Sequence, residues 1–260
     1  MERRTFMVNS GAVGIGAVGS ISGAESAEAA NSRDYFELKR YTFETIEKRN
    51  IFDKFMAEAA IPAMNRIGID HVGVFYSEDE ISPVYVLRRF RSLESFADSK
   101  QKLLNDKEYL RKGADFLDII TENMVYSRVE SSLMLAFSGV PHLETPVDSE
   151  DRIFQLRIYE SPSVKTGLKK IEMFNTGELA VFRETGLNPV FFGETLIGEK
   201  MQNLTYMVGF NNKQEQTESW KKFGSHPEWQ RLKSIPEFDD KKNLCGITNI
   251  VLLPAPYSQI

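Results

Sequence analysis

Residues 35–41 read Tyr-Phe-Glu-Leu-Lys-Arg-Tyr and residues 153–159 read Ile-Phe-Gln-Leu-Arg-Ile-Tyr, so the chain carries nearly the same segment twice. A repeat with a period of about one domain indicates two copies of a small domain rather than a solenoid of short repeats. The identical residues lie 118 positions apart (154 − 36 for the first pair) at Phe36 and Phe154, Leu38 and Leu156, Tyr41 and Tyr159, Gly68 and Gly186, and Val72 and Val190.

The composition is that of an ordinary globular protein. Of 260 residues, 42% are hydrophobic and 27% charged, which is enough apolar material for two cores of about 100 residues each. The net charge of −5, without basic blocks, argues against a general nucleic-acid binder. No apolar run reaches the roughly 20 residues needed to span a bilayer, so we expect no stable membrane anchor. With one cysteine, Cys245, no intramolecular disulfide is possible, and three scattered histidines have no metal-ligand spacing.

The first residues follow the order of an export signal. Glu2-Arg3-Arg4-Thr5-Phe6-Met7 resembles a twin-arginine motif, a soft apolar stretch extends to Ile21, and Ala27-Glu28-Ala29 offers a cleavage site. We therefore expect residues 1–29 to be a signal peptide and the protein to be periplasmic or secreted. The alternative is a disordered tail with a chance arginine pair.

Each half follows one order of elements, βαββααβ. Alternating or β-branched segments predict strands at residues 35–41, 71–76, 84–90 and 124–135, and again at 154–159, 190–196, 204–210 and 247–253. An apolar stripe from Phe52 to Ile67 predicts a long helix, with a kink or an end at Pro62. Gly68 and Gly186 are expected to end the long helix of each half in the left-handed conformation.

The remaining helices are expected from start signals. Ser92 is expected to cap one helix, and Asn105 with Glu108 a short one. In the second half, Ser161-Pro162 is expected to start the long helix. A helix with Trp220 and Phe223 and a short one at Ser225 and Glu228 follow. The expected domains are 30–137 and 152–260, joined by a linker at 138–151 with two prolines.

The alternation in the repeat gives each first strand two faces. We expect Phe36 and Leu38, with Phe154 and Leu156, to pack each sheet against its own helices. Lys39, Tyr41, Arg157 and Tyr159 would then lie between the two sheets. There they could bind an anionic or aromatic ligand, or pair with Glu37 and with one another. One of Arg88 and Arg89 must point inward, where it needs a partner.

The residues resemble those of the NIPSNAP family. The resemblance rests on the Phe-x-Leu-x-x-Tyr strand, the long helix ending at Gly68, the strand Tyr85–Phe90 and the helix leading into His226-Pro227-Glu228-Trp229, and it covers residues 35–254. It implies an α+β fold of two tandem ferredoxin-like domains, whose antiparallel sheets face each other as a dimeric α/β barrel within one chain. The resemblance carries no catalytic residues with it. Relatives by fold include cofactor-independent monooxygenases and chlorite dismutase haem enzymes.

Two histidines are further candidates. His226 could be a haem ligand or a general base, or simply a first-turn residue of a capped helix. His71 could be an acid/base residue at a pocket mouth, or a polar residue at the start of a strand.

The sequence does not decide whether the protein is an enzyme. We expect an exported protein that binds a small organic molecule in or beside the barrel, with cofactor-free oxidation of a small aromatic or acyl compound as the best enzymatic analogy. The alternatives are a haem protein of the chlorite dismutase type and a non-enzymatic interaction module. The sequence does not decide whether the protein forms a homo-oligomer.

Overall fold

Eight strands form the centre of the molecule in the computed structural model, which describes residues 32–78 and 81–260. The predicted signal peptide, residues 1–29, lies outside the described residues. The strands of the first half are β1 (Tyr35–Thr42), β2 (Gly73–Ser77), β3 (Val84–Phe90) and β4 (Arg128–Ala136). Those of the second half are β5 (Ile153–Glu160), β6 (Asn188–Ile197), β7 (Asn203–Phe210) and β8 (Gly246–Pro254).

The strands close into one antiparallel barrel in the order β1-β3-β2-β8-β5-β7-β6-β4. Each half contributes a four-stranded ferredoxin-like sheet, and the two sheets join at two seams, β2 with β8 and β4 with β6. The predicted fold is therefore confirmed. A barrel built from both halves removes the open edges that each sheet would have alone.

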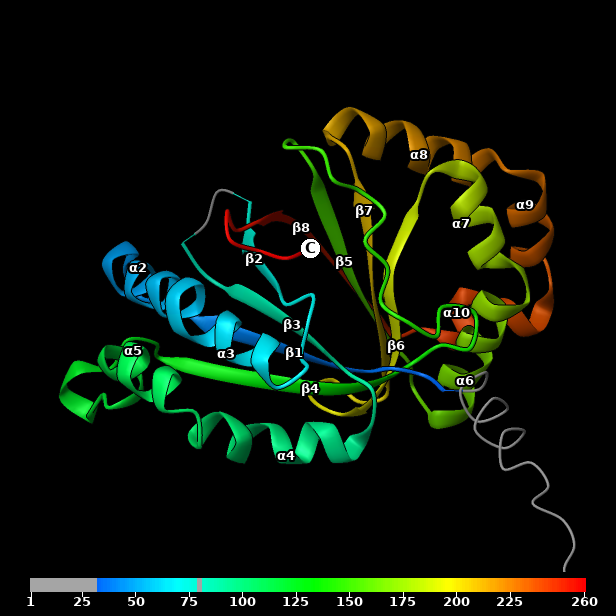
Figure 1. The fold of residues 1–260 in the computed structure, drawn as a ribbon. Coiled ribbons are helices and arrows are strands. Elements are labelled where there is room, and N and C mark those ends of the chain that lie inside the picture. Colours follow the sequence, from blue (N-terminus) through cyan, green and yellow to red (C-terminus); the bar gives the residue numbers. More distant parts are fainter. Residues whose placement is uncertain (1–31, 79–80) are drawn as a thin grey trace, which may run out of the picture. The chain divides into compact units, whose positions relative to one another are not determined.

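Helices cover the outer faces of both sheets, those of the first half on one side and those of the second half on the other (Figure 1). The first half has α2 (Ile46–Phe55), a π-helical turn η1 (Met56–Ala60), α3 (Ile61–Arg66), α4 (Leu93–Leu104), α5 (Lys107–Leu117) and the short η2 (Thr121–Asn123). The second half has α6 (Val164–Met173), η3 (Phe174–Glu178), α7 (Leu179–Thr185), α8 (Lys213–Ser225), α9 (Pro227–Lys233), η4 (Pro236–Phe238) and α10 (Asp240–Asn243).

Some helix ends lie where the sequence predicts them, and others differ from the prediction. Gly68 and Gly186 have φ angles of +84° and +81°, and Ser92 caps α4, as predicted. Asp106 rather than Asn105 caps α5, which has 11 residues and is not short. Ser163 rather than Ser161 caps α6, since its hydroxyl accepts from the backbone of the third helical residue.

The long helix of each half contains a five-residue π-helical turn in place of a simple kink. The first turn ends just before Pro62, and the N–H of Ile61 reaches the carbonyl of Met56. The second turn occupies the same place in its half, where no proline is present. Because both halves have the turn, it does not depend on Pro62.

The predicted faces of the strands were inverted. Phe36, Leu38, Phe154 and Leu156 lie in the barrel core, which both sheets build together. Residues that alternate with them point outward, under the helices. The reason is physical: a period of two separates the faces of a strand but does not say which face meets the helices when both are buried. Of the two faces of β1 and of β5, the more uniformly apolar one points into the barrel.

The chain outside the sheets closes one end of the barrel. The predicted linker at 138–151 contains no helix, and Val147 from it packs in the barrel core together with Ile260. Among the described residues, no helix is both long and apolar enough to cross a membrane. Within residues 32–78 and 81–260 no group of three or more His, Cys, Asp or Glu side chains is placed to hold a metal ion.

Candidate functional site

A cavity of about 600 Å³ lies between the outer face of the first sheet and the helices that cover it. This volume is within the range of about 300–1,000 Å³ that is typical of small-molecule sites. Its walls come from β1, β3, α2 to α5 and the segment before β4. The lining residues are Glu37, Lys39, Tyr41, Phe55, Met56, Ala60, Met64, Val86, Arg88, Phe96, Ala97, Ser99, Lys100, Leu103, Leu104, Tyr109, Leu117 and Tyr126.

A buried ion pair forms part of the cavity floor. Arg88 on β3 lies directly opposite Glu37 on β1, and its Nε donates to Oε2 of Glu37 at 2.6 Å. Ser131 on β4 donates to the other carboxylate oxygen at 2.8 Å. Arg88 thus points outward, under the helices, and not between the sheets, and Glu37 is the partner that it needs there. Both oxygens of Glu37 are occupied by the protein itself.

Lys39 stands on the same face of β1, two residues from Glu37, and its side chain lines the cavity. Its Nζ lies 3.8 Å from Oε1 of Glu37, beyond hydrogen-bond distance. Burial lowers the pKa of Lys39. The Glu37 carboxylate opposes that shift, and the nearby cations Arg88 and Lys100 add to it. The amine is therefore less firmly protonated than a surface lysine.

Three tyrosines complete the polar part of the lining. Burial raises the pKa of Tyr41 and that of Tyr109, so both remain neutral phenols that can donate a hydrogen bond. The ring of Tyr41 lies edge-on to that of Tyr126, with centroids 5.5 Å apart, and 4.8 Å from the ring of Phe52. These contacts hold the phenol in place on the wall of the cavity.

The charges of the cavity favour an anion. Lys39, Arg88 and Lys100 are cationic groups in the lining and Glu37 is its only acid, an excess of two formal positive charges (3 − 1) when Lys39 is protonated. The whole chain carries −5, so this excess is local. Apolar walls with a few cationic and phenolic groups suit a small organic anion with an apolar body.

The equivalent space under the second sheet is filled. Strand register and an offset of 118 or 120 residues pair Lys39 with Arg157, Tyr41 with Tyr159, Met56 with Phe174, Ala60 with Glu178, Val86 with Tyr206, Arg88 with Val208, Lys100 with Trp220, Leu103 with Phe223 and Tyr109 with Trp229.

At four of these positions the second half places an aromatic ring where the first half has none. Phe174 and Tyr206 are fully buried, with ring centroids 5.4 Å apart, and Tyr206 exchanges a hydrogen bond with Tyr159 at 3.1 Å. Arg157 lies over the ring of Trp220, 4.6 Å from its centroid. The duplicated domain therefore has an open cavity in one copy and a packed aromatic core in the other.

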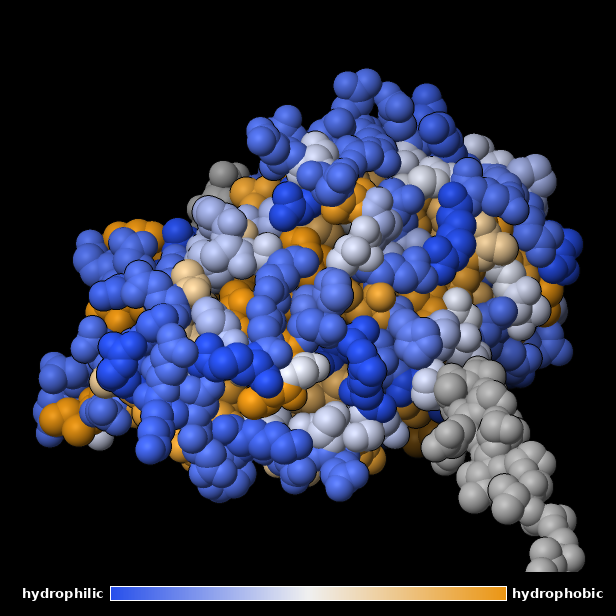
Figure 2. All heavy atoms as spheres, in the orientation of Figure 1, coloured by the Kyte–Doolittle hydropathy of each residue, from blue (hydrophilic) through white to orange (hydrophobic). Residues whose placement is uncertain are grey.

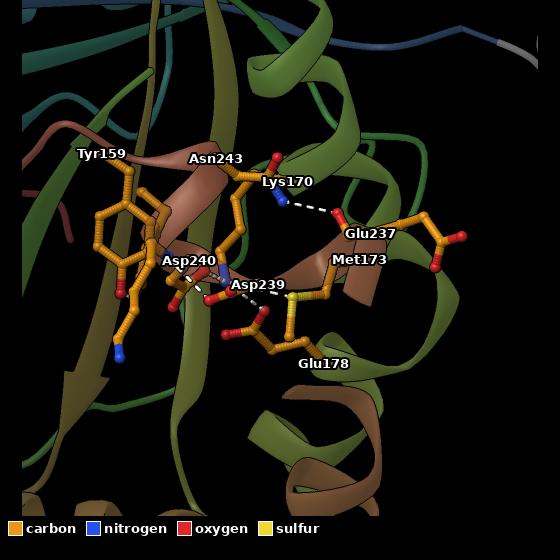
Figure 3. Close-up of polar contacts among 10 residues, drawn as sticks. Tyr159, Lys170, Met173, Glu178, Glu237, Asp239, Asp240 and Asn243 are labelled. Carbon is orange, nitrogen blue, oxygen red and sulfur yellow. Dashed lines mark hydrogen bonds and ion pairs between the residues drawn. The ribbon is translucent and has the colours of Figure 1, made fainter. Parts of the chain in front are cut away.

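The buried ion pair of the second half lies on its helices and not on its sheet. The ammonium of Lys170 on α6 lies 3.2 Å from Glu178 and 3.0 Å from Asp240 (Figure 3). The rings of Tyr159, Phe174 and Trp229 lie around it.

The two acids keep Lys170 protonated. Burial alone would lower the pKa of Lys170, but the carboxylates of Glu178 and Asp240 outweigh it and raise the pKa. The first half has Phe52 and Ala60 at the positions of Lys170 and Glu178. Of these two residues Ala60 lines the cavity, so the longer Glu178 occupies space that the first half leaves open there.

The four strand residues predicted as one site do not meet. Lys39 and Tyr41 lie under the helices of the first half, and Arg157 and Tyr159 lie under those of the second, with the barrel core between them. The prediction of a ligand held among all four between the sheets is wrong, because each pair projects away from the barrel. Lys39 and Tyr41 remain candidate site residues, now in one cavity.

The two candidate histidines lie elsewhere. His71 has a φ of +52°, is about half exposed and lies beside Asp70, outside the cavity lining. His226 caps α9: its Nδ1 accepts from the N–H of Glu228 at 3.2 Å, and its Nε2 lies 3.1 Å from Glu184. Both ring nitrogens of His226 are engaged. Since no histidine lines the cavity, the described residues do not fit a histidine-ligated haem there.

A second, smaller cavity opens at one end of the barrel. It has a volume of about 290 Å³ and lies between the sheets, with Arg40, Tyr85 and Thr205 among its lining residues. Its charged groups are largely paired within the protein, as in the contact between Arg40 and Glu130 at 2.5 Å. The larger cavity beside the barrel is the better candidate site.

Sequence reasoning missed the helix residues of the site. Lys100 and Tyr109 project into the cavity from α4 and α5, and Met56 from the π-helical turn. The matched pair of Tyr109 and Trp229 was visible in the sequence, and so was the replacement of Lys100 by Trp220. These two positions, at which the second half has tryptophan, were the available signal that the copies differ in packing.

The surface around the site is mostly hydrophilic on the face seen in Figure 2, with hydrophobic atoms near the outer ends of α2 and α5. Among the exposed large hydrophobic residues are Ile46 and Ile51 on α2 and Leu110 on α5. Single exposed apolar residues are normal on soluble proteins.

The fold and the cavity define a class of protein: a tandem ferredoxin-like barrel with a ligand-sized cavity beneath one of its two sheets. The chain belongs to the NIPSNAP family, whose sequence model matches residues 36–133 and 154–259, one match in each half. A comparison with curated proteins gave no match.

Solved structures share the fold at very low sequence identity. A candidate monooxygenase from Lactobacillus acidophilus NCFM is 8% identical, with a TM-score of 0.58 over 85% of this chain and 94% of the other. A candidate monooxygenase from Fusobacterium nucleatum is 8% identical, with a TM-score of 0.56 over 86% and 93%. An anthrone oxidase-like protein is 9% identical, with a TM-score of 0.51 over 87% and 93%. These similarities show the fold alone.

Proposed function

We propose that this protein binds a small organic anion with an apolar or aromatic body in the cavity beneath its first sheet. The observation that carries the proposal is the contrast between the two copies of the domain. One copy keeps a cavity of about 600 Å³ with an excess of cationic groups, and the other fills the same space with rings. Close packing is the default of a protein interior, so a cavity kept in one of two copies is evidence of use.

Cationic and phenolic groups account for the polarity of the ligand. Lys100 is exposed at the edge of the cavity, where it can meet a carboxylate as the ligand enters. Tyr41 and Tyr109 offer neutral donors deeper inside. Met56, Val86 and Leu103 supply the apolar contact area.

As a reaction we propose the cofactor-free oxidation of a small aromatic or acyl compound. Support comes from the names of the solved neighbours, two candidate monooxygenases and an anthrone oxidase-like protein, and from the groups in the cavity. Such a reaction needs a group that removes a proton from the substrate, after which the electron-rich carbon passes electrons to dioxygen. Lys39, whose pKa is lowered, can accept that proton.

We also propose that the chain is exported by the twin-arginine route, on the basis of Arg3-Arg4 and the small residues at Ala27 and Ala29. Amino-terminal sequencing of the protein from a periplasmic fraction should find a mature chain that begins near Ala30. Replacement of Arg3 and Arg4 by Lys should keep it in the cytoplasm. A full-length protein in the periplasm would contradict this proposal.

Filling the cavity tests the proposed binding. Lys100→Trp introduces the residue that the second half carries at the same position, and removes a cation as well. Titration with 2-naphthoate, followed by its fluorescence, should give saturable binding to the unchanged chain. Binding to Lys100→Trp should be at least about tenfold weaker, the equivalent of about 1.4 kcal/mol. Native mass spectrometry of the purified chain would identify any ligand that remains bound.

The matched control is Gln101→Trp, which adds the same ring on α4 at an exposed residue outside the cavity. It should bind like the unchanged chain. Equal affinity of the unchanged chain and Lys100→Trp would place the ligand elsewhere and refute the proposal.

A further inference from the structure

Lys39 is the more buried of the two cavity lysines, and its only ion pair is a loose one. Glu37, its nearest acid, already accepts from Arg88 and Ser131, and the Lys39 amine stays 3.8 Å from it. No hydrogen bond to the Lys39 ammonium is formed by the described residues at normal distance. A partly buried cation whose nearest acid is shared with an arginine is incompletely compensated and costs stability, which is consistent with a use for the amine.

The surroundings make the neutral, nucleophilic form of this amine more accessible than it is in a surface lysine. About a quarter of the side chain is exposed, and the exposed part faces the cavity. Groups facing it from neighbouring elements are Glu37 and Tyr41 on β1, Arg88 on β3, Lys100 on α4 and Tyr109 on α5. Arg88 and Lys100 are cations, and the charge of Glu37 is already neutralised by Arg88. Desolvation beside other cationic groups is a known way to activate a lysine.

The same residue has been replaced in the other copy. Arg157 occupies the equivalent position on β5, where its guanidinium packs over Trp220. An arginine carries its charge permanently and does not act as an amine nucleophile. The copy with the cavity has lysine, and the filled copy has arginine, so the amine occurs only where a ligand could reach it.

We propose that Lys39 forms an imine with a small carbonyl compound that carries an anionic group, such as a 2-oxo acid with an apolar or aromatic side chain. The amine nitrogen attacks the carbonyl carbon. A carbon–nitrogen bond forms, and the carbonyl oxygen leaves as water with the two hydrogens of the amine. Lys100 and Arg88 supply the positive charge for the carboxylate, and the tyrosines supply donors for the carbonyl oxygen.

This inference rests on the proposed function, because it uses the same cavity, but it can fail separately. The step needs no oxidant or reductant. Besides binding ligands, the cavity would then attach one class of ligand covalently and reversibly. It also specifies that class by chemistry, since an acid without a carbonyl group would bind but not react.

The test uses the full-length chain with phenylpyruvate as the probe and sodium cyanoborohydride to reduce any imine. Reduction adds hydride to the imine carbon and leaves a stable secondary amine. Peptide mapping by mass spectrometry should find the adduct at Lys39 well above every other lysine, with the mass of the probe less one oxygen. Prior addition of 2-naphthoate should suppress it.

Lys39→Arg is the matched variant, because the chain itself carries arginine at the equivalent position. It should fold, as judged by circular dichroism, and lose the adduct. Lys165→Arg, an exposed replacement on α6, should label like the unchanged chain. Labelling spread evenly over the lysines, or an adduct on Lys39→Arg equal to that on the unchanged chain, would overturn the proposal.

The outcomes separate the two claims. Binding of 2-naphthoate without any Lys39 adduct refutes the imine and leaves the proposed function in place. Absence of 2-naphthoate binding together with absence of the adduct refutes both.

Discussion

Glu37 and Arg88 are the residues on which the shape of the cavity floor depends. Their side chains face each other across β1 and β3, and each is at least nine-tenths buried. A buried ion pair contributes little net stability, but removing one partner leaves the other charge uncompensated. In the second half the same register places Gln155 opposite Val208, so the fold itself accepts a neutral alternative.

Replacing Glu37 alone should therefore be more harmful than replacing both partners. We expect Glu37→Gln to lower the free energy of unfolding by about 3–5 kcal/mol, because Arg88 loses its counter-ion in a buried site. The double variant Glu37→Gln with Arg88→Val copies the second half and should recover at least half of that loss. Chemical denaturation of the four chains of this cycle measures the coupling. Additive losses would show that the pair is not coupled.

Lys39 should give the stability of the protein a characteristic pH dependence. Its pKa is lowered in the folded state from 10.5, so between the lowered value and 10.5 the unfolded chain binds more protons than the folded one. The free energy of unfolding contributed by this residue therefore rises with pH across that window, and below it the cost of the buried charge is present in full.

Lys39→Met removes this contribution. Relative to the unchanged chain, the variant should be most favoured near neutral pH, and its advantage should shrink as the pH approaches 10.5. Denaturation series at several pH values measure the difference, with the exposed Lys165→Met as a control. A difference that does not change with pH would show that the Lys39 amine is not perturbed.

At the scale of elements, the sequence predicted most strands and the end of each long helix. β3 agrees residue for residue with the prediction, and Gly68 and Gly186 have the left-handed φ expected of them. Local chemistry decides these features: alternating apolar residues for a strand, and a residue without Cβ for a positive φ. The π-helical turns and the length of α5 were missed, because packing of several helices on the sheet sets them.

The two helix-ending glycines make a matched pair. Gly68→Ala should lower the free energy of unfolding by about 1 kcal/mol through backbone strain alone, since no atom lies within 4 Å of the added Cβ. Gly186→Ala should cost more, because its Cβ would lie 2.9 Å from the hydroxyl of Ser219. Gly224→Ala, inside α8 with open space around it, should be neutral or stabilising by up to about 1 kcal/mol. Thermal unfolding ranks the three, and an equal loss for all would contradict this explanation.

At the scale of the whole molecule, the candidate site could be predicted only in part. Lys39 and Tyr41 were identified from the repeat, but Arg157, Tyr159, His71 and His226 lie away from the cavity. The sequence shows two faces of each strand without showing which one meets the helices, and both are buried here. The cavity also needs residues that lie between positions 56 and 126 on different helices to come together over the sheet. Their spacing in the sequence alone does not predict this.

The barrel makes the two halves dependent on each other. Phe36 and Phe154 lie in one core, and the seams of β2 with β8 and β4 with β6 close the edges of both sheets. We expect the full chain to unfold in a single transition, and segment 33–137 or 152–260 alone to give no folded monomer, since each would expose its half of the barrel core. Light scattering and circular dichroism of the separate halves test this. A monomeric half with a sharp unfolding transition would contradict it.

The central claim is that the copies of one domain have diverged into a ligand site and a structural core. The most direct test is a crystal structure of the full-length chain grown with phenylpyruvate. We predict ligand density between β1, β3 and the helices α2 to α5, in contact with Lys39, and none beneath the second sheet. Density in the 290 Å³ cavity at the end of the barrel, or under the second sheet, with the first cavity empty, would contradict the account.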